Sequence, residues 1–205
     1  MIRPSSRTLV LAIAALLVLS GLAAGGWLWY AAGQRRAMGA YAEALTGARA
    51  APASPEARAA AIRSLETVLG QYPSAAATAE GAYQLGNLRY DDRQFAAARA
   101  AYEIALAKGP PPTIRALASL AIGRTWEAER NYSKAIEAHQ AALARLGPRD
   151  FLYEEAFVAL GRVQELGGRR DDAIASYRKM LKDLPETRRG DEVRSRLARL
   201  GASAP

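Results

Sequence analysis

The stretch AEGAYQLGNLRYDDRQFAAARAAYEIALAKGP, residues 79–110, decides the fold of this chain. Apolar side chains recur at helical spacing in its first half, which ends at the polar break 91–94. The second half starts at Phe95 and stops at Gly109-Pro110, because proline cannot donate to the helical hydrogen-bond ladder. Alanine, leucine, glutamate and arginine dominate both halves. The pattern predicts two α-helices joined by a short turn.

This unit recurs along the chain at a nearly constant interval. Prolines return after 37, 38 and 37 residues, and small and aromatic residues keep the same stride. A fixed period in this range indicates a solenoid, in which each unit buries its hydrophobic face on its neighbour. A solenoid offers an extended surface, so binding is the expected kind of function. The residues in step are Pro73, Pro110, Pro148 and Pro185, with Gly86, Gly123 and Gly161, and with Tyr102, His139 and Tyr177.

The units resemble the tetratricopeptide repeat, a helix–turn–helix of roughly 34 residues with fixed small and large positions. In the best-formed unit those positions hold Leu85-Gly86, Phe95, Ala98, Tyr102, Ala105 and Pro110. The resemblance implies an all-α fold: a right-handed α-solenoid of about four helix pairs plus a capping helix at 188–201. The expected repeats are a degenerate one at 37–73, then 74–110, 111–148 and 149–187.

The beginning of the chain differs from the repeats. Residues 8–34 carry no charged side chain, and 9–32 are apolar apart from one serine and glycines. A helix over 9–32 is roughly 36 Å long, enough to cross a hydrocarbon core of about 30 Å. The aromatic cluster WLWY at 27–30 suits the headgroup level of a bilayer. We therefore expect a transmembrane signal anchor at 9–32 after a short head at 1–8.

Two alternatives concern this segment. It resembles a cleaved signal peptide in its charged start, Arg3 and Arg7, and in the small residues of Ala23-Ala24-Gly25. Its orientation is not decided by charge, because Arg35-Arg36 after the span balance the arginines before it.

Gly21 and Gly25 match the small-xxx-small spacing that lets two membrane helices touch closely. This spacing predicts a helix-packing face within the anchor. An alanine-rich span also produces the spacing by chance, which is the alternative interpretation.

Few side chains could carry chemistry. His139 is the single histidine and there is no cysteine, so an ordinary zinc site has no ligands. The pairs Asp91-Asp92 and Asp171-Asp172 lie beside inter-helix turns, where a structural role suffices. The motifs GxxxxGK, HExxH and GxSxG do not occur. We expect no enzyme: no catalytic residue, no cofactor, no metal site and no small-molecule substrate.

The charge balance adds little about partners. The formal net charge is +8, but the basic residues are dispersed and no aromatic-basic recognition motif accompanies them. We therefore expect no nucleic-acid partner. The absence of cysteine is compatible with an oxidising compartment.

Protein binding is expected on the concave face, which the outward positions of each first helix line in this fold. Aromatic, aliphatic and polar groups together suit an extended peptide or a helix. Packing of these side chains on the adjacent unit is the alternative. The lysine–asparagine clamp of some tetratricopeptide proteins is not expected, since Asn87 lacks its lysine partner. The predicted groove residues are Tyr83, Asn87, Tyr90, Leu120, Arg124, Glu127, Val158, Arg162 and Glu165.

The short head, the anchor with an aromatic end and the repeat domain together resemble the ancillary SecYEG translocon subunit family. Residues 27–45 carry part of this likeness. It implies an uncleaved single-pass anchor in the bacterial inner membrane, a periplasmic repeat domain, and the translocon, chaperones or client polypeptides as partners. The chain departs from the family in its eight-residue head.

The first hypothesis for function is therefore a membrane-anchored adaptor at the periplasmic face. The second is a cell-envelope scaffold for division, outer-membrane assembly or pilus biogenesis, either anchored or secreted after signal cleavage. The third is an adaptor facing the cytosol, which follows if the membrane helix has the reverse orientation.

Overall fold

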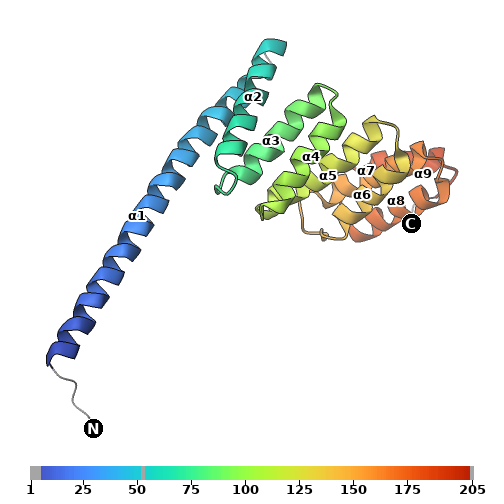
Figure 1. Cartoon of the computed structure of the whole chain (residues 1–205). Coiled ribbons are helices and arrows are strands. Elements are labelled where there is room, and N and C mark those ends of the chain that lie inside the picture. Colours follow the sequence, from blue (N-terminus) through green and yellow to red (C-terminus); the bar gives the residue numbers. More distant parts are fainter. Residues whose placement is uncertain (1–5, 52–53, 204–205) are drawn as a thin grey trace, which may run out of the picture.

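The structure is a computed structural model that describes residues 6–51 and 54–203. These residues form nine α-helices and no strand, so the predicted all-α fold is confirmed. Figure 1 shows one long N-terminal helix followed by a stack of shorter helices. The helices are α1 (Ser6–Ala50), α2 (Pro55–Gln71), α3 (Thr78–Asp91), α4 (Phe95–Ala107), α5 (Pro112–Ala128), α6 (Tyr132–Leu143), α7 (Tyr153–Leu166), α8 (Arg170–Asp183) and α9 (Gly190–Arg199).

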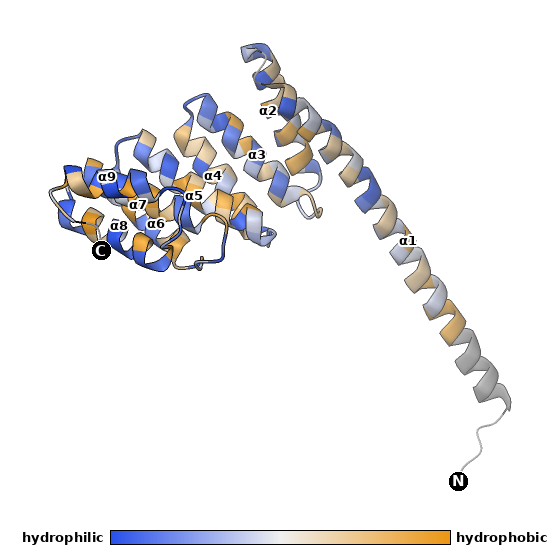
Figure 2. Ribbon diagram, turned by 180° about the vertical axis from the view of Figure 1, so that it is seen from behind, coloured by the Kyte–Doolittle hydropathy of each residue, from blue (hydrophilic) through white to orange (hydrophobic). Residues whose placement is uncertain are grey.

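Helix α1 contains both the apolar N-terminal segment and the beginning of the first repeat unit. Its large apolar side chains between Leu16 and Tyr30 are exposed, and its length and composition allow it to cross a membrane or to serve as a signal sequence. Figure 2 shows this apolar stretch giving way to a hydrophilic band before α1 reaches α2. The helix continues through Gly33 without a break. The segment boundaries proposed from the sequence, at 9–32 and 37–73, therefore divide one continuous helix and remain predictions.

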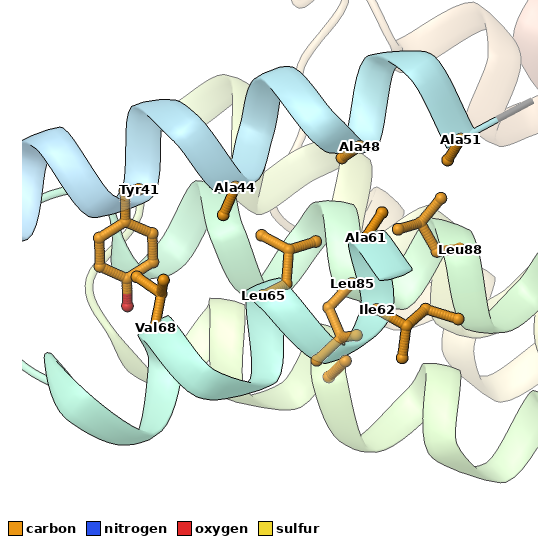
Figure 3. Close-up of a cluster of buried hydrophobic side chains, with 11 residues drawn as sticks. Tyr41, Ala44, Ala48, Ala51, Ala61, Ile62, Leu65, Val68, Leu85 and Leu88 are labelled. Atoms are coloured by element: carbon orange, nitrogen blue, oxygen red, sulfur yellow. The ribbon is translucent and has the colours of Figure 1, made fainter. Parts of the chain in front are cut away.

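The last turns of α1 belong to the solenoid core. Tyr41, Ala44 and Ala48 are buried against α2 and α3, together with Leu65 and other apolar side chains (Figure 3). The C-terminal part of α1 thus packs as the first helix of the first unit.

The start of α2 follows from its sequence. The Ser54 hydroxyl accepts a hydrogen bond from the Ala57 N–H at 3.1 Å, which satisfies one of the free donors of the first turn. Pro55 stands at the first helical position, where its fixed φ suits the helix and its missing N–H costs nothing. This local chemistry starts the second helix of the first unit.

In each later unit an aromatic ring packs on a glycine of the partner helix. A Cβ atom added to Gly86 of α3 would lie 2.4 Å from the ring of Tyr102 in α4, closer than any real contact. Only glycine lets the two helices approach this closely around a buried ring. The corresponding pairs, at 2.4 and 2.3 Å, are Gly123–His139 and Gly161–Tyr177.

The two helices of the first unit pack without this glycine–ring contact. Leu65 takes the place of the ring and Arg49 takes the place of the glycine. Tyr41 of α1 instead packs on Gly81 of the next unit. Its hydroxyl lies within hydrogen-bond distance of two acceptors, the Tyr72 carbonyl oxygen at 3.1 Å and the Thr78 hydroxyl oxygen at 3.2 Å. This tyrosine ties α1 to the turn between α2 and α3.

The turns inside the three later units share one backbone feature. One residue in each adopts a left-handed conformation, with φ of 58° at Arg93, 58° at Arg130 and 73° at Gly168. These positions keep the stride of the prolines, so the turn geometry repeats with the sequence. A non-glycine residue in this conformation costs roughly 1–2 kcal/mol.

Candidate protein-binding surface

The predicted groove residues lie on the first helices of the units, α3, α5 and α7. We call the surface formed by Tyr83, Asn87, Tyr90, Arg124, Glu127, Arg162 and Glu165 the first-helix face. Its members are exposed or half-buried, so a partner can reach them.

The aromatic end of the first-helix face lies on α3. The Tyr83 ring centroid is 5.8 Å from that of the buried Tyr102, whose hydroxyl donates a hydrogen bond to the Asn87 side-chain oxygen at 2.9 Å. The guanidinium carbon of Arg124, on α5, lies 5.3 Å from the centre of the Tyr90 ring. The pairing of Tyr90 with Arg124 links the first-helix face across two units.

The polar end of the face is a series of ion pairs. Glu127 of α5 pairs with Arg162 of α7, and Glu165 of α7 pairs with Arg196 of α9 at 3.1 Å. The Tyr177 hydroxyl donates a hydrogen bond to Glu165 at 2.5 Å. The contacts therefore run from unit to unit as far as the capping helix, which holds the charged groups of the face in fixed positions.

Burial determines the ionisation of the groups beneath this surface. Burial raises the pKa of the Tyr177 hydroxyl, and its hydrogen bond to Glu165 acts in the same direction. Burial also raises the pKa of Tyr102. Both hydroxyls thus stay neutral donors. Burial lowers the pKa of the Arg162 guanidinium, as do the neighbouring cations of Arg196 and Arg124.

Two of the predicted groove residues lie in the core. Leu120 is 6% exposed and packs with Ala142 and Ala156, while Val158 is 2% exposed and belongs to the core around Tyr177. Contrary to the prediction that they line a groove, neither side chain is accessible to a partner, because Leu120 is covered from α6 and α7 and Val158 lies in a core formed with α8 and α9. The alternative, packing on the neighbouring unit, holds at these two positions.

The sequence did not lead us to expect that side chains of α9 belong to this surface. Val193 and Leu197 of this helix are buried, and Glu192 and Arg196 form an ion pair at 3.2 Å on its outer side. Arg189 also pairs with Glu192, at 2.8 Å. The i, i+4 spacing of Glu192 and Arg196 beside an apolar stripe is the signal that could have indicated them.

His139 is a core residue. It is fully buried against Gly123, and both ring nitrogens lack a hydrogen-bond partner within the described residues. Burial lowers the pKa of His139 to about 4, and the positive charge of Arg124 contributes in the same direction. The side chain is therefore neutral at physiological pH.

Gly21 and Gly25 lie on the exposed part of α1, and a Cβ at either position would meet no atom within 4 Å. Both glycines are therefore accessible to another helix. The packing face that they would form remains a prediction.

Known proteins share this architecture. Residues 156–192, which comprise most of α7, all of α8 and the start of α9, match the family described as Tetratricopeptide repeat. The fold is a tetratricopeptide-repeat solenoid. Tetratricopeptide repeats are protein-binding scaffolds, which makes this solenoid a scaffold for binding proteins or peptides.

Two solved structures are similar to the tetratricopeptide solenoid. They are described as "Crystal structure of MamA protein" and "Crystal structure of MamA", each with a TM-score of 0.53, 25% sequence identity and 63% of this chain covered. The matched region spans 65% of the first of those chains and 70% of the second. No curated protein matches the sequence.

Proposed function

We propose that this chain is a membrane-anchored adaptor that binds polypeptides on its first-helix face. The observation that carries the proposal is the continuity of α1, whose exposed apolar half and solenoid-forming half are one helix. A binding face fixed to the membrane raises the local concentration of its partner, so weak contacts suffice for capture. The anchor would remain uncleaved, because its apolar run over 9–32 is longer than that of a signal peptide and continues into the aromatic cluster at 27–30.

The ligand chemistry follows from the groups on the face. Tyr83 and Tyr90 offer half-buried rings, and the exposed Arg124 guanidinium has no carboxylate partner among the described residues. Glu127 and Arg162 already satisfy each other. An extended peptide with an apolar side chain followed by a carboxylate suits this order of groups: the apolar side chain would contact the rings and the carboxylate would pair with Arg124.

Location and partner rest on the resemblance to the ancillary SecYEG translocon subunit family. The bacterial inner membrane, a periplasmic repeat domain, and the translocon or a periplasmic chaperone as partner are therefore part of the proposal. A compartment-specific reporter enzyme fused after Pro205 shows on which side of the membrane the repeats lie, because it follows the repeat domain. Activity in the cytoplasm would contradict a periplasmic location.

Photocrosslinking tests the partner. A photoreactive side chain at Tyr90 or Arg124 is expected to capture a translocon component, a chaperone or a nascent chain in intact cells. The matched control is the exposed Ala97 on α4, outside the first-helix face, which should capture none of them. Capture of division, outer-membrane or pilus assembly proteins instead would support the cell-envelope scaffold. Equal capture at Ala97 and Arg124 would contradict binding on the first-helix face.

A further inference from the structure

The turns between units lie together on one edge of the solenoid. We call this the inter-unit edge and define it by residues 72–77, 108–111, 144–152 and 184–189. Figures 1 and 2 both show these turns on the side of the stack that faces the N-terminal half of α1. The turns inside the units lie on the opposite edge. If the apolar half of α1 spans a bilayer, the inter-unit edge faces the bilayer surface.

The first inter-unit turn lies beside the aromatic end of the apolar segment. A hollow of about 340 Å³ separates the turn from α1 and is lined by Trp29, Tyr30 and Arg36 on the helix and by Tyr72 and Pro73 on the turn. Tryptophan and tyrosine rings prefer the headgroup level, and Arg36 lies only about 10 Å further along the helix than Trp29. This end of the edge is thus at the height of the lipid headgroups.

The rest of the edge has cations beside exposed apolar surface. Lys108, Arg145 and Arg149 are exposed, and none forms an ion pair with another described residue. Phe151 is 68% exposed at the same edge. Arg145 and Phe151 also line a hollow of about 360 Å³ with Leu146. Cations around an exposed aromatic ring are typical of segments that lie at the surface of an anionic membrane.

The carboxylates within this edge are Asp150 and Glu186, and neither forms an ion pair with Lys108, Arg145 or Arg149 among the described residues. Asp150 accepts a hydrogen bond from the Gly147 N–H at 2.7 Å, within the turn itself. Arg189, at the last inter-unit turn, pairs with Glu155 and Glu192 and is therefore not among these free cations. On the opposite edge three carboxylates pair with arginines. The pairs there are Arg58–Asp92 at 2.8 Å, Arg99–Glu129 at 2.7 Å and Arg169–Asp172 at 2.6 Å.

We propose that the inter-unit edge binds anionic phospholipid headgroups, with Phe151 inserted among them, so that the solenoid lies along the bilayer. This inference rests on the proposed membrane anchoring and adds a second membrane contact to it. Transmembrane helices tilt by about 20° on average, which is enough to bring a rigidly attached edge towards the surface. The first-helix face then runs along the membrane, where an emerging or anchored polypeptide can reach it.

The test uses the absence of cysteine, which allows single labels in the full-length chain. A nitroxide at Ala144→Cys reports the edge, and one at Ala23→Cys reports the anchor. The protein is placed in nanodiscs of phosphatidylcholine with or without phosphatidylglycerol, and accessibility to oxygen and to a water-soluble nickel complex is measured. The Ala144 label is expected to become protected from nickel in anionic discs and to stay accessible in neutral discs.

Matched charge reversals test the source of the attraction. Arg145→Glu with Arg149→Glu should abolish the protection of the Ala144 label in anionic discs. Arg93→Glu with Arg130→Glu changes the charge equally on the opposite edge and should preserve the protection. Thermal unfolding followed by circular dichroism verifies that both double variants are folded.

The outcomes separate the two proposals. Protection of the Ala23 label by lipid, together with an Ala144 label equally accessible in both kinds of disc, would overturn the edge contact alone. A water-exposed Ala23 label would overturn the anchoring and the edge contact together. Equal loss of protection in both double variants would also overturn the edge contact, since a general charge effect would then explain it.

Discussion

At position 139 a histidine stands where neighbouring units have tyrosine. The Tyr177 hydroxyl donates to Glu165, four residues beyond the glycine of its unit, whereas neither His139 nitrogen has a partner in the described part of the chain. Glu127 holds the position that corresponds to Glu165. His139→Tyr should therefore stabilise the protein, because the new hydroxyl can reach Glu127 and no buried nitrogen is left unpaired.

The same substitution should change the pH dependence of stability. The folded pKa of His139 is about 4, below the ordinary value of about 6.5, so the unfolded chain takes up the proton first. Above pH ~6.5 the ring is neutral in both the folded and the unfolded chain, and the protein has its full stability. As the pH falls to ~4, protonation of the unfolded chain lowers the free energy of unfolding by roughly 3 kcal/mol. Urea unfolding between pH 7 and 4 measures this loss. The difference between wild type and His139→Tyr should grow as the pH falls; a constant difference would contradict the buried neutral histidine.

The contact between Gly86 and Tyr102 predicts a strong coupling between these residues. Gly86→Ala should destabilise by about 1–3 kcal/mol, because the new methyl group overlaps the buried ring. Adding Tyr102→Leu should relieve part of this cost, as in the first unit, where Leu65 corresponds to the ring and Arg49 to the glycine. A double-mutant cycle by urea unfolding measures the coupling, which we expect to reach about 1 kcal/mol. Strictly additive effects would show that the ring does not clash with the methyl group.

Among the structural elements, the turns within the units depend on their left-handed residue. Gly168 has φ of 73°, so Gly168→Ala should destabilise by about 1 kcal/mol. Gly39 is the matched control, since it lies exposed within α1 and a methyl group added there would meet no atom within 4 Å. Gly39→Ala should stabilise by about 0.5–1 kcal/mol, because glycine is a poor helix former. Thermal unfolding of both variants shows whether each substitution raises or lowers the melting temperature. Destabilisation by both substitutions would contradict the explanation from the left-handed backbone at Gly168.

Most of the elements could be predicted from sequence because most helices end next to a proline or a glycine, such as Pro110 after α4. The stride of the glycines and rings also indicated which helices pack in pairs. The surface was harder to predict, since exposure depends on the next unit in the stack. Leu120 and Val158 share the spacing of Tyr83 but are buried, Leu120 with residues of α6 and α7 and Val158 with residues of α8 and α9. The contribution of Arg196 to the surface was not predicted, because α9 does not follow the spacing of the repeats.

For the whole molecule, the unbroken α1 fixes the direction of the solenoid relative to the apolar segment. Tyr41 and the turn at Tyr72 add a second connection between α1 and the repeats. The ion pairs from Glu127 to Arg196 then link the later units to one another. Because the contacts pass from unit to unit, a change in the direction of α1 moves the whole first-helix face.

Replacing Gly33 by proline should uncouple the solenoid from the apolar segment. Proline within a helix removes one hydrogen bond, clashes with the carbonyl of Trp29 and costs about 3 kcal/mol. The matched control is Gly33→Ala, because a methyl group at this position meets no atom within 4 Å. Nitroxides at Ala24→Cys and Ala144→Cys report the distance between the two parts by pulsed electron resonance in nanodiscs. We expect one narrow distribution for the control and a broad one for Gly33→Pro. An equally narrow distribution in Gly33→Pro would show that the connection through Tyr41 and Tyr72 alone holds the orientation.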